Sequence, residues 1–295
     1  MTSTSTQQPA TESGTFQLSG DLPVHRLGFG AMQITGPGIW GPPKDHDEVI
    51  RVLRRAIDLG INLIDTADAY GPYVSEELIA EALYPYPQGL VIATKGGLTR
   101  TGPGQWPENG TPQHLREAIE GSLKRLRLER IDLYQLHRPD RNVPFEDSVN
   151  TLAGLQREGK IRHVGLSNVT TEQLATAQRI VPIVSVQNRY NLTDREAEDV
   201  LDACTQQNIG FIPWFPLATG DLAEPGGPLA GIAQRHHAEP AQIALAWLLQ
   251  RSPVMLPIPG TSSVAHLEQN TEAACIHLSQ EDVDQLNRLG GQGSS

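Results

Sequence analysis

The sequence predicts an α/β fold, a (β/α)8 TIM barrel whose bottom is closed by an N-terminal β-hairpin. Three observations carry this prediction. Apolar runs of strand length recur eight times and alternate with segments of helical period. No composition break divides the chain, and single barrel domains routinely reach lengths such as these 295 residues. Polar side chains with reactive chemistry are dispersed over many strand ends, as is typical of barrels.

The predicted elements follow in order along the chain. Residues 1–14 are expected to be a disordered tail, and residues 15–295 a single barrel domain that starts with a hairpin turned at Gly20-Asp21. The eight strands are expected at Leu27–Gly30, Leu63–Asp65, Leu90–Thr94, Ile131–Leu136, Ile161–Leu166, Ile183–Val186, Gly210–Ile212 and Val254–Pro257. The helices are expected at Asp45–Leu59, Thr111–Leu126, Pro144–Glu158, Thr171–Ile180, Ala197–Gln207, Pro240–Gln250, Val264–Ala274 and Ser279–Leu289.

An open doubly wound sheet is the alternative to a closed barrel. A nucleotide-binding sheet of that kind favours Gly-x-Gly-x-x-Gly after its first strand. The segment Gly28–Gln33 has the first two glycines and lacks the third. This departure, together with the dispersed strand-end residues, favours the barrel.

Composition and charge narrow the function classes. A formal net charge of −11 disfavours nucleic acid and anionic membranes as partners. The start of the chain has no signal-peptide pattern and no apolar run reaches the roughly 18 residues of a membrane span, so a cytoplasmic location is expected. Cys204 and Cys275 fit no metal or redox spacing, and no His or Cys cluster predicts a metal site.

Four residues with proton-transfer chemistry fall at or just after three successive strand ends. Asp65 closes the second predicted strand, Tyr70 follows it, Lys95 follows the third strand and His137 the fourth. Parallel neighbours lie about 4.8 Å apart, so these side chains are expected within roughly 10 Å of one another. A nearby ammonium lowers the pKa of a phenol, and a buried ammonium needs a partner such as Asp65. Asp68, three residues further along, is the weaker candidate for that partner.

Each of these residues also has a structural interpretation. Tyr70 alone suits a rim aromatic and His137 a structural histidine. Their convergence with Lys95 and Asp65 favours general acid–base chemistry.

The second half of the chain predicts a ligand cradle. Ser167, Asn168 and Gln187 stand at adjacent strand ends, where small polar groups clamp a carboxamide, although the first two also suit a helix cap. Trp214 offers a flat ring, for which core packing is the alternative. The segment Pro259–Ser263 opens a helix, and its free amides and hydroxyls predict an anion site.

Two tryptophans predict part of a substrate pocket. Trp40 and Trp106 lie in the Gly/Pro-rich loops Gly36–Pro43 and Gly96–Gly110. Together with Met32 they are expected to line the pocket, with ordinary loop anchoring as the alternative.

Taken together, these residues resemble the aldo-keto reductase family from about Leu18 to Leu289. The resemblance rests on the order and spacing of Leu27–Met32, Asp65–Gly71, Thr94-Lys95, Asp132–His137, Gly165–Asn168, Gln187-Asn188, Pro213–Leu217 and Ile258–Thr261 with Asn270. It implies an eight-fold barrel with a closing hairpin and the reduction of aldehydes or ketones to alcohols by hydride transfer.

The resemblance also implies roles for individual residues. Tyr70 is expected to be the general acid, Lys95 to lower its pKa, Asp65 to hold Lys95, and His137 to orient the carbonyl. The implied cofactor contacts are Ser167, Asn168, Gln187, Trp214, Phe215, Pro216, Leu217, Ala218, Ile258, Gly260, Thr261, Ser262, Ser263, His266, Gln269 and Asn270.

The same resemblance indicates the cofactor and the substrate class. NADP(H) is favoured over NAD(H), although Gly260 and His266, with serines between them, stand where cations usually hold the 2′-phosphate. Several segments are similar to a bacterial subgroup that includes pyridoxal reductase, which makes pyridoxal a candidate substrate. The short C-terminal segment, Gly290–Ser295, implies an open cleft.

Two other functions compete with this interpretation. A redox-sensing nicotinamide-binding interaction module with little turnover is disfavoured by the complete set of four residues. A metal-dependent barrel hydrolase lacks ligands. The sequence leaves the oligomeric state open.

Overall fold

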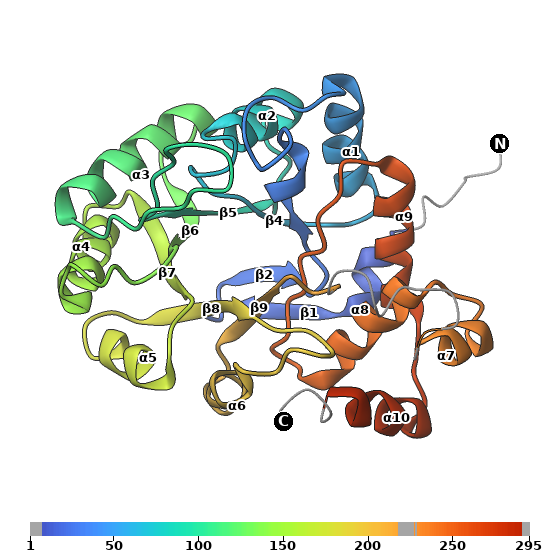
Figure 1. The fold of residues 1–295 in the computed structure, drawn as a ribbon. Coiled ribbons are helices and arrows are strands. Elements are labelled where there is room, and N and C mark those ends of the chain that lie inside the picture. The colour runs from blue at the N-terminus through green and yellow to red at the C-terminus, as the bar shows by residue number, and fades with distance from the viewer. Residues whose placement is uncertain (1–7, 218–226, 228, 291–295) are drawn as a thin grey trace.

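The computed structural model describes residues 8–217, 227 and 229–290. A curled sheet of seven parallel strands, in the order β3-β4-β5-β6-β7-β8-β9, forms its centre, with helices on the outside (Figure 1). The strands are β3 (Phe29–Gly30), β4 (Leu63–Asp65), β5 (Val91–Gly96), β6 (Ile131–Leu136), β7 (Ile161–Ser167), β8 (Ile183–Arg189) and β9 (Gly210–Trp214). Each strand pairs with the next one along the chain, as repeated βα units require.

The segment predicted as the eighth strand closes the barrel without forming a regular strand. The amide of Phe211 in β9 donates to the carbonyl of Val254 at 2.8 Å. On the other side, the amide of Gly28, just before β3, donates to the carbonyl of Pro257 at 2.9 Å. Prolines in this segment lack an amide donor, which limits a continuous ladder. The predicted α/β barrel is confirmed, with a bridging segment in place of one strand.

Helices cover the outer face of the barrel. They are α1 (His46–Asp58), α2 (Val74–Leu83), α3 (Pro112–Leu126), α4 (Phe145–Arg157), α5 (Thr171–Gln178), α6 (Glu198–Gln207), α7 (Ala230–Arg235), α8 (Pro240–Arg251), α9 (Val264–Glu272) and α10 (Gln280–Gly290). The short 3-10 helices η2 (Ala31–Ile34) and η3 (Ala273–Cys275) follow β3 and α9, respectively. None of the helices in the described part of the chain has the length and apolar character needed to cross a membrane.

Two helices, α2 and α7, are absent from the sequence prediction. Helix α2 begins after Tyr73, a left-handed residue with φ 70°, and no side chain caps its first turn. It therefore lacks the start signal that Thr111 and Pro112 give α3. Tertiary packing, rather than a local signal, sets where α2 begins.

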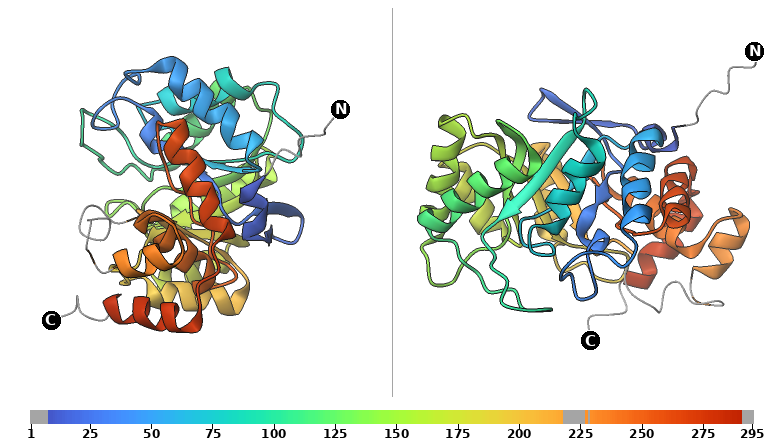
Figure 2. Two further views of the ribbon diagram at one scale, coloured as in Figure 1. Left: turned by 90° about the vertical axis from the view of Figure 1, so that its right-hand side faces the viewer. Right: turned by 90° about the horizontal axis from the view of Figure 1, so that it is seen from above.

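The hairpin β1 (Thr15–Leu18) and β2 (Leu22–His25) covers the amino-terminal end of the barrel, to one side of the ring in Figure 2. The amide of His25 donates to the side chain of Asn62, directly before β4, at 2.7 Å. Leu18 and Val24 are fully buried in the main core cluster. The hairpin thus seals this end, which leaves the carboxyl ends of the strands as the open face.

The prediction of a disordered tail is wrong for its second half. Pro9–Ser13 form the 3-10 helix η1, and the amide of Ala10 donates to the carbonyl of Leu59 at 3.1 Å. Ala10 is fully buried against the end of α1. A polar segment is expected to be disordered when it buries no apolar side chain, and here the burial of Ala10 orders the segment. Residues 1–7 of the expected tail lie outside the described residues.

Candidate active site

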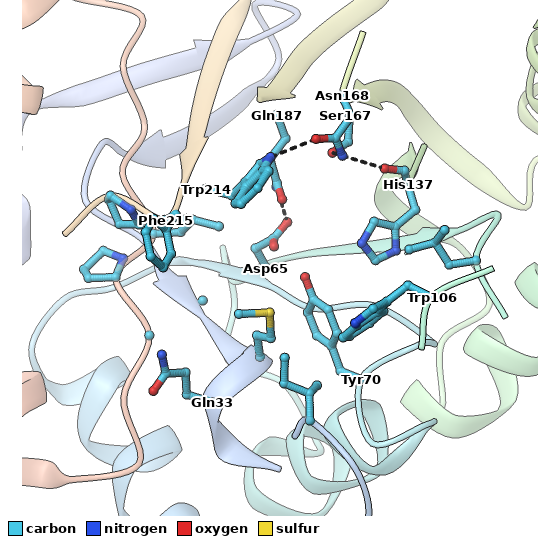
Figure 3. Close-up of a pocket in the computed structure, with 18 of the residues that line it drawn as sticks. Gln33, Asp65, Tyr70, Trp106, His137, Ser167, Asn168, Gln187, Trp214 and Phe215 are labelled. Carbon is cyan, nitrogen blue, oxygen red and sulfur yellow. Dashed lines mark hydrogen bonds between the residues drawn. The ribbon is translucent and has the colours of Figure 1, made fainter. Parts of the chain in front are cut away.

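A pocket of about 400 Å³ opens at the carboxyl ends of the strands, where Asp65, Tyr70 and His137 lie close together (Figure 3). The buried ammonium of Lys95 lies beside them. Its Nζ donates to Asp65 Oδ1 at 2.5 Å, to the carbonyl of Thr66 at 2.9 Å and to Tyr70 Oη at 3.2 Å. The four side chains predicted from the strand ends therefore form one group.

Strand register explains why Lys95 reaches Asp65. Asp65 is paired with Ala93 on the neighbouring strand, and Lys95 lies two residues further along. Because alternate residues of a strand face the same side, both Ala93 and Lys95 face the barrel interior. The Lys95 side chain is fully buried, and three oxygen acceptors surround its three protons. Burial lowers the pKa of Lys95, but the Asp65 carboxylate and the Tyr70 phenol together more than offset this, so the net shift is upward.

The second oxygen of Asp65 accepts two hydrogen bonds that the sequence analysis did not predict. Gln135 Nε2 and Gln187 Nε2 each donate to Asp65 Oδ2 at 2.9 Å. Gln135 is the register partner of Lys95 and is fully buried. Its neighbour Gly165 makes room for it, since a Cβ there would lie 2.9 Å from Gln135 Cγ. The available signal was a glutamine that follows Ile131 and Leu133 at alternate positions of one strand, on the face that is otherwise apolar.

Replacing Gln135 with Met is expected to weaken the group around Asp65. One of the two amide donors to Oδ2 is lost and the carboxylate is left less satisfied, at a cost of about 1–3 kcal/mol in unfolding free energy. Chemical denaturation measures this cost. Replacing the exposed Gln113 with Met, which removes only a surface contact to Glu117, is the matched control and should change stability by less than about 0.5 kcal/mol. Equal stability of the two variants would contradict the assigned contact.

The phenol of Tyr70 is buried between the ammonium and the open pocket. Burial raises its pKa above the usual value, while the Lys95 charge acts in the opposite direction. The expected lowering of the Tyr70 pKa by Lys95 is present but is outweighed by burial. The phenol is consequently a hydrogen-bond donor throughout the neutral range.

The imidazole of His137 is held in its neutral form. Burial lowers its pKa well below the usual value, and the positive charges of Lys95, Arg138 and Arg100 add to this effect. Its ring meets the Tyr70 ring edge-on, with centroids 5.9 Å apart. Its Nδ1 has no hydrogen-bond partner among the described residues. The imidazole therefore lies beside the phenol with a ring nitrogen that makes no hydrogen bond to the described residues.

The opposite wall of the pocket carries the predicted cradle residues. Trp214 Nε1 donates to Asn168 Oδ1 at 3.0 Å, and Asn168 Nδ2 donates to Ser167 Oγ and to the carbonyl of His137, each at 3.0 Å. Asn168 adopts the left-handed conformation, with φ 58°, which turns its amide toward these partners. Figure 3 shows the Trp214 ring standing across the cavity from Tyr70. The network fixes a flat aromatic face next to two polar side chains.

The predicted cofactor residues separate into two groups. Nine line the pocket: Ser167, Asn168, Gln187, Trp214, Phe215, Pro216, Leu217, Ile258 and Gly260. Six others, on α9 or its approach, lie outside the lining of this pocket: Thr261 and Asn270 are buried, Ser263 is half-buried, and Ser262, His266 and Gln269 are exposed. Ala218 lies outside the described residues.

The helix end predicted as an anion site is partly occupied by the protein itself. Glu48 of α1 accepts from the amide of Val264, the first residue of α9, at 3.0 Å. Thr261 Oγ1 accepts from the amide of Ser263 at 3.1 Å. The pKa of Glu48 is lowered, first by the Val264 amide and then by Arg51. A carboxylate at this helix end reduces the positive potential that an incoming anion would meet.

The expected substrate pocket needs one correction. Met32 and Trp106 line the cavity, but Trp40 does not; its neighbour Ile39 does so instead. The Trp40 ring packs on the guanidinium of Arg100, 5.4 Å from its centroid. Leu98, Arg138 and Gln33 also line the pocket and were missed, because loop conformation rather than strand register places them.

Comparison with known proteins identifies the class. Residues 26–290 match the Aldo/keto reductase family. The chain is 52% identical over 289 residues to an uncharacterized oxidoreductase of Schizosaccharomyces pombe, covering 98% of this chain and 94% of that protein. It is 45% identical over 283 residues to pyridoxine 4-dehydrogenase of Escherichia coli, covering 94% and 98%. An aldo/keto reductase from Klebsiella pneumoniae, solved in complex with NADP and acetate, superimposes with a TM-score of 0.79 at 28% identity, covering 93% and 94%.

The fold and these matches define a barrel oxidoreductase. The chain belongs to the aldo/keto reductase family.

Proposed function

We propose that this protein is an NADP(H)-dependent carbonyl reductase in which Tyr70 is the general acid. The single observation that carries the proposal is the contact of Lys95 Nζ with both Asp65 and the Tyr70 phenol at the base of an open pocket. A buried ammonium at this position stabilises the phenolate that forms when Tyr70 gives up its proton. The role of each residue in this group is part of the proposal.

The residues on the opposite wall fit a nicotinamide cofactor. Ser167 Oγ accepts from Asn168 and keeps its own proton for a ligand, and the amide oxygen of Gln187 is available beside it. The Trp214 ring, fixed by Asn168, offers a face for stacking. A bound nicotinamide supplies the hydride for reduction of the carbonyl carbon. The relative solved with NADP supports the same cofactor here.

Tyr70, on the wall of the pocket opposite the cofactor residues, would supply the proton. The carbonyl oxygen of a substrate between the two walls would accept a hydrogen bond from Tyr70 Oη. As negative charge develops on that oxygen, the phenol proton moves to it and the product is an alcohol. Neutral His137, whose ring meets Tyr70 edge-on, would donate a second hydrogen bond to the same oxygen. Oxidation of an alcohol runs through the same groups in reverse.

The rate of reduction is expected to be independent of pH between about 6.5 and 9. Reduction requires protonated Tyr70, whose raised pKa keeps it protonated up to the alkaline end of this window. It also requires neutral His137, whose lowered pKa keeps it neutral down to the acid end. The measurement is kcat/KM for a slow aldehyde across this range. A titration inside the window that moves when Tyr70 or His137 is replaced would contradict the assignment.

We infer an aromatic aldehyde as a good substrate, with pyridoxal as one candidate. The pocket walls are mainly aromatic or aliphatic, and the relative from Escherichia coli is a pyridoxine dehydrogenase. Steady-state rates for pyridoxal and simple aldehydes, each with NADPH and with NADH, test this inference. Turnover of none of them with either cofactor would overturn the proposal and favour a cofactor-binding module instead.

A further inference from the structure

Arg100 lies in the loop after β5 and contacts three loops that line the pocket. Its Nη1 donates to the carbonyls of Ile39 at 2.9 Å and Ala69 at 2.8 Å, and its Nη2 donates to the carbonyl of Gly38 at 3.2 Å. Ile39 lines the pocket, and Ala69 directly precedes Tyr70. One guanidinium therefore ties the loop of residues 36–43 and the Tyr70 loop to its own loop.

The same guanidinium stacks on the tryptophan that forms the pocket wall. Its central carbon lies 3.6 Å from the centroid of the Trp106 ring, and Trp106 lines the cavity (Figure 3). Trp106 in turn meets the Tyr70 ring edge-on, with centroids 6.4 Å apart. Trp40 packs on Arg100 as well, at 5.4 Å. The order of contacts is Trp40, Arg100, Trp106 and Tyr70.

The chemistry of this position requires arginine rather than another cation. A planar guanidinium stacks flat on an indole and at the same time donates in its plane to several carbonyls, whereas an ammonium has no flat face and carries all its donors on one atom. Arg100 has no carboxylate partner among the described residues, so its charge is used on ring faces and carbonyl oxygens. The loop of residues 97–110 is rich in Gly and Pro and contains no helix or regular strand to hold Trp106 in place.

We propose that Arg100 is a positioning residue that holds Trp106 against Tyr70 and thereby sets the preference of the pocket for aromatic carbonyl substrates. This proposal rests on the carbonyl reductase activity proposed above. A bulky aromatic aldehyde uses the fixed Trp106 face, whereas a short aliphatic aldehyde needs little more than the Tyr70 hydroxyl. Replacing Arg100 should therefore lower activity on aromatic aldehydes more than activity on short aliphatic ones.

The test compares Arg100→Met and Arg100→Lys with the wild type on 4-nitrobenzaldehyde and propanal. For both variants we expect kcat/KM to fall about tenfold or more with the aromatic aldehyde and less than about threefold with propanal. NADPH affinity, measured by fluorescence titration, should change less than about twofold, because Arg100 lies outside the cofactor wall. Arg116→Met, which removes a surface arginine paired with Glu158, is the matched control and should leave both rates unchanged.

A double-variant cycle separates this role from a general structural one. In a Trp106→Ala background, Arg100→Met should cause little further loss of aromatic selectivity, because its effect passes through the indole. Equal losses on both aldehydes, or additive effects in the cycle, would overturn the proposal.

Limited digestion with a glutamate-specific protease gives a readout that does not depend on activity. Glu108 lies in the same loop as Trp106 and is followed by Asn109, so we expect faster cleavage after Glu108 in Arg100→Met than in the wild type or in Arg116→Met. Unchanged cleavage would contradict the positioning role of Arg100 even if the rates differed. A wild-type protein that reduced neither aldehyde would defeat the proposed function, while the digestion would still test whether Arg100 holds the loop of Trp106.

Discussion

Replacing Tyr70 with Phe is expected to lower kcat for aldehyde reduction by about 10²- to 10⁴-fold while NADPH affinity stays within about twofold of the wild type. The variant keeps the ring, which packs against Trp106 and His137, and removes only the hydroxyl that Lys95 contacts at 3.2 Å. The loss should appear in kcat and kcat/KM together, because the proton is transferred only as the alcohol forms. Steady-state kinetics and a fluorescence titration of cofactor measure the two quantities.

Tyr86→Phe is the matched control for this variant. Its hydroxyl donates to the carbonyl of Leu126 at 2.7 Å, far from the pocket lining. It should lose about 1 kcal/mol of stability at most and retain the wild-type rate. A Tyr70→Phe protein as active as Tyr86→Phe would remove Tyr70 from the role of acid.

Replacing Lys95 with Met has the largest expected effect on stability. The change leaves the buried Asp65 carboxylate without its cation, which costs about 3–5 kcal/mol in a site of this kind. Two amide donors, Gln135 and Gln187, still contact Asp65 and soften the loss without neutralising the charge. Turnover should also fall, because no cation remains to stabilise the Tyr70 phenolate. Chemical denaturation and steady-state rates measure the two effects.

Two further variants separate stability from catalysis. The double variant Asp65→Asn with Lys95→Met removes both charges and should recover much of the stability while staying inactive. Lys160→Met removes a surface cation beside Glu120 and should cost less than about 1 kcal/mol. A Lys95→Met protein as stable as Lys160→Met would show that the buried pair contributes little.

The sequence was most informative where strand register places side chains. Asp65 and Lys95 end neighbouring parallel strands, so their convergence follows from the strand spacing once the βα pattern is recognised. The same register places Gln135 next to Lys95, and a search for polar residues within apolar strands would have found it. The barrel itself follows from eight repeats of one pattern, although prolines leave the last repeat as a bridging segment.

Contacts made by loops and by distant helices could not be predicted in this way. Whether Trp40 or Ile39 faces the cavity depends on Ile39 adopting a left-handed conformation, φ 55°, which no local signal in the sequence requires. Glu48 reaches the first turn of α9 from a helix 216 residues earlier. Arg100 acquires its role only when three loops fold around one guanidinium. In each case tertiary packing decides the outcome.

Rapid mixing of the protein, already loaded with NADPH, with an aromatic aldehyde shows whether Tyr70 delivers the proton. We predict that the wild type oxidises the bound cofactor in the first turnover, forms one alcohol per cofactor consumed and continues at a steady rate, whereas Tyr70→Phe binds NADPH but is about 10²- to 10⁴-fold slower in both phases. A Tyr70→Phe protein with an undiminished first turnover, or a wild type that binds both partners and forms no alcohol, would contradict this prediction.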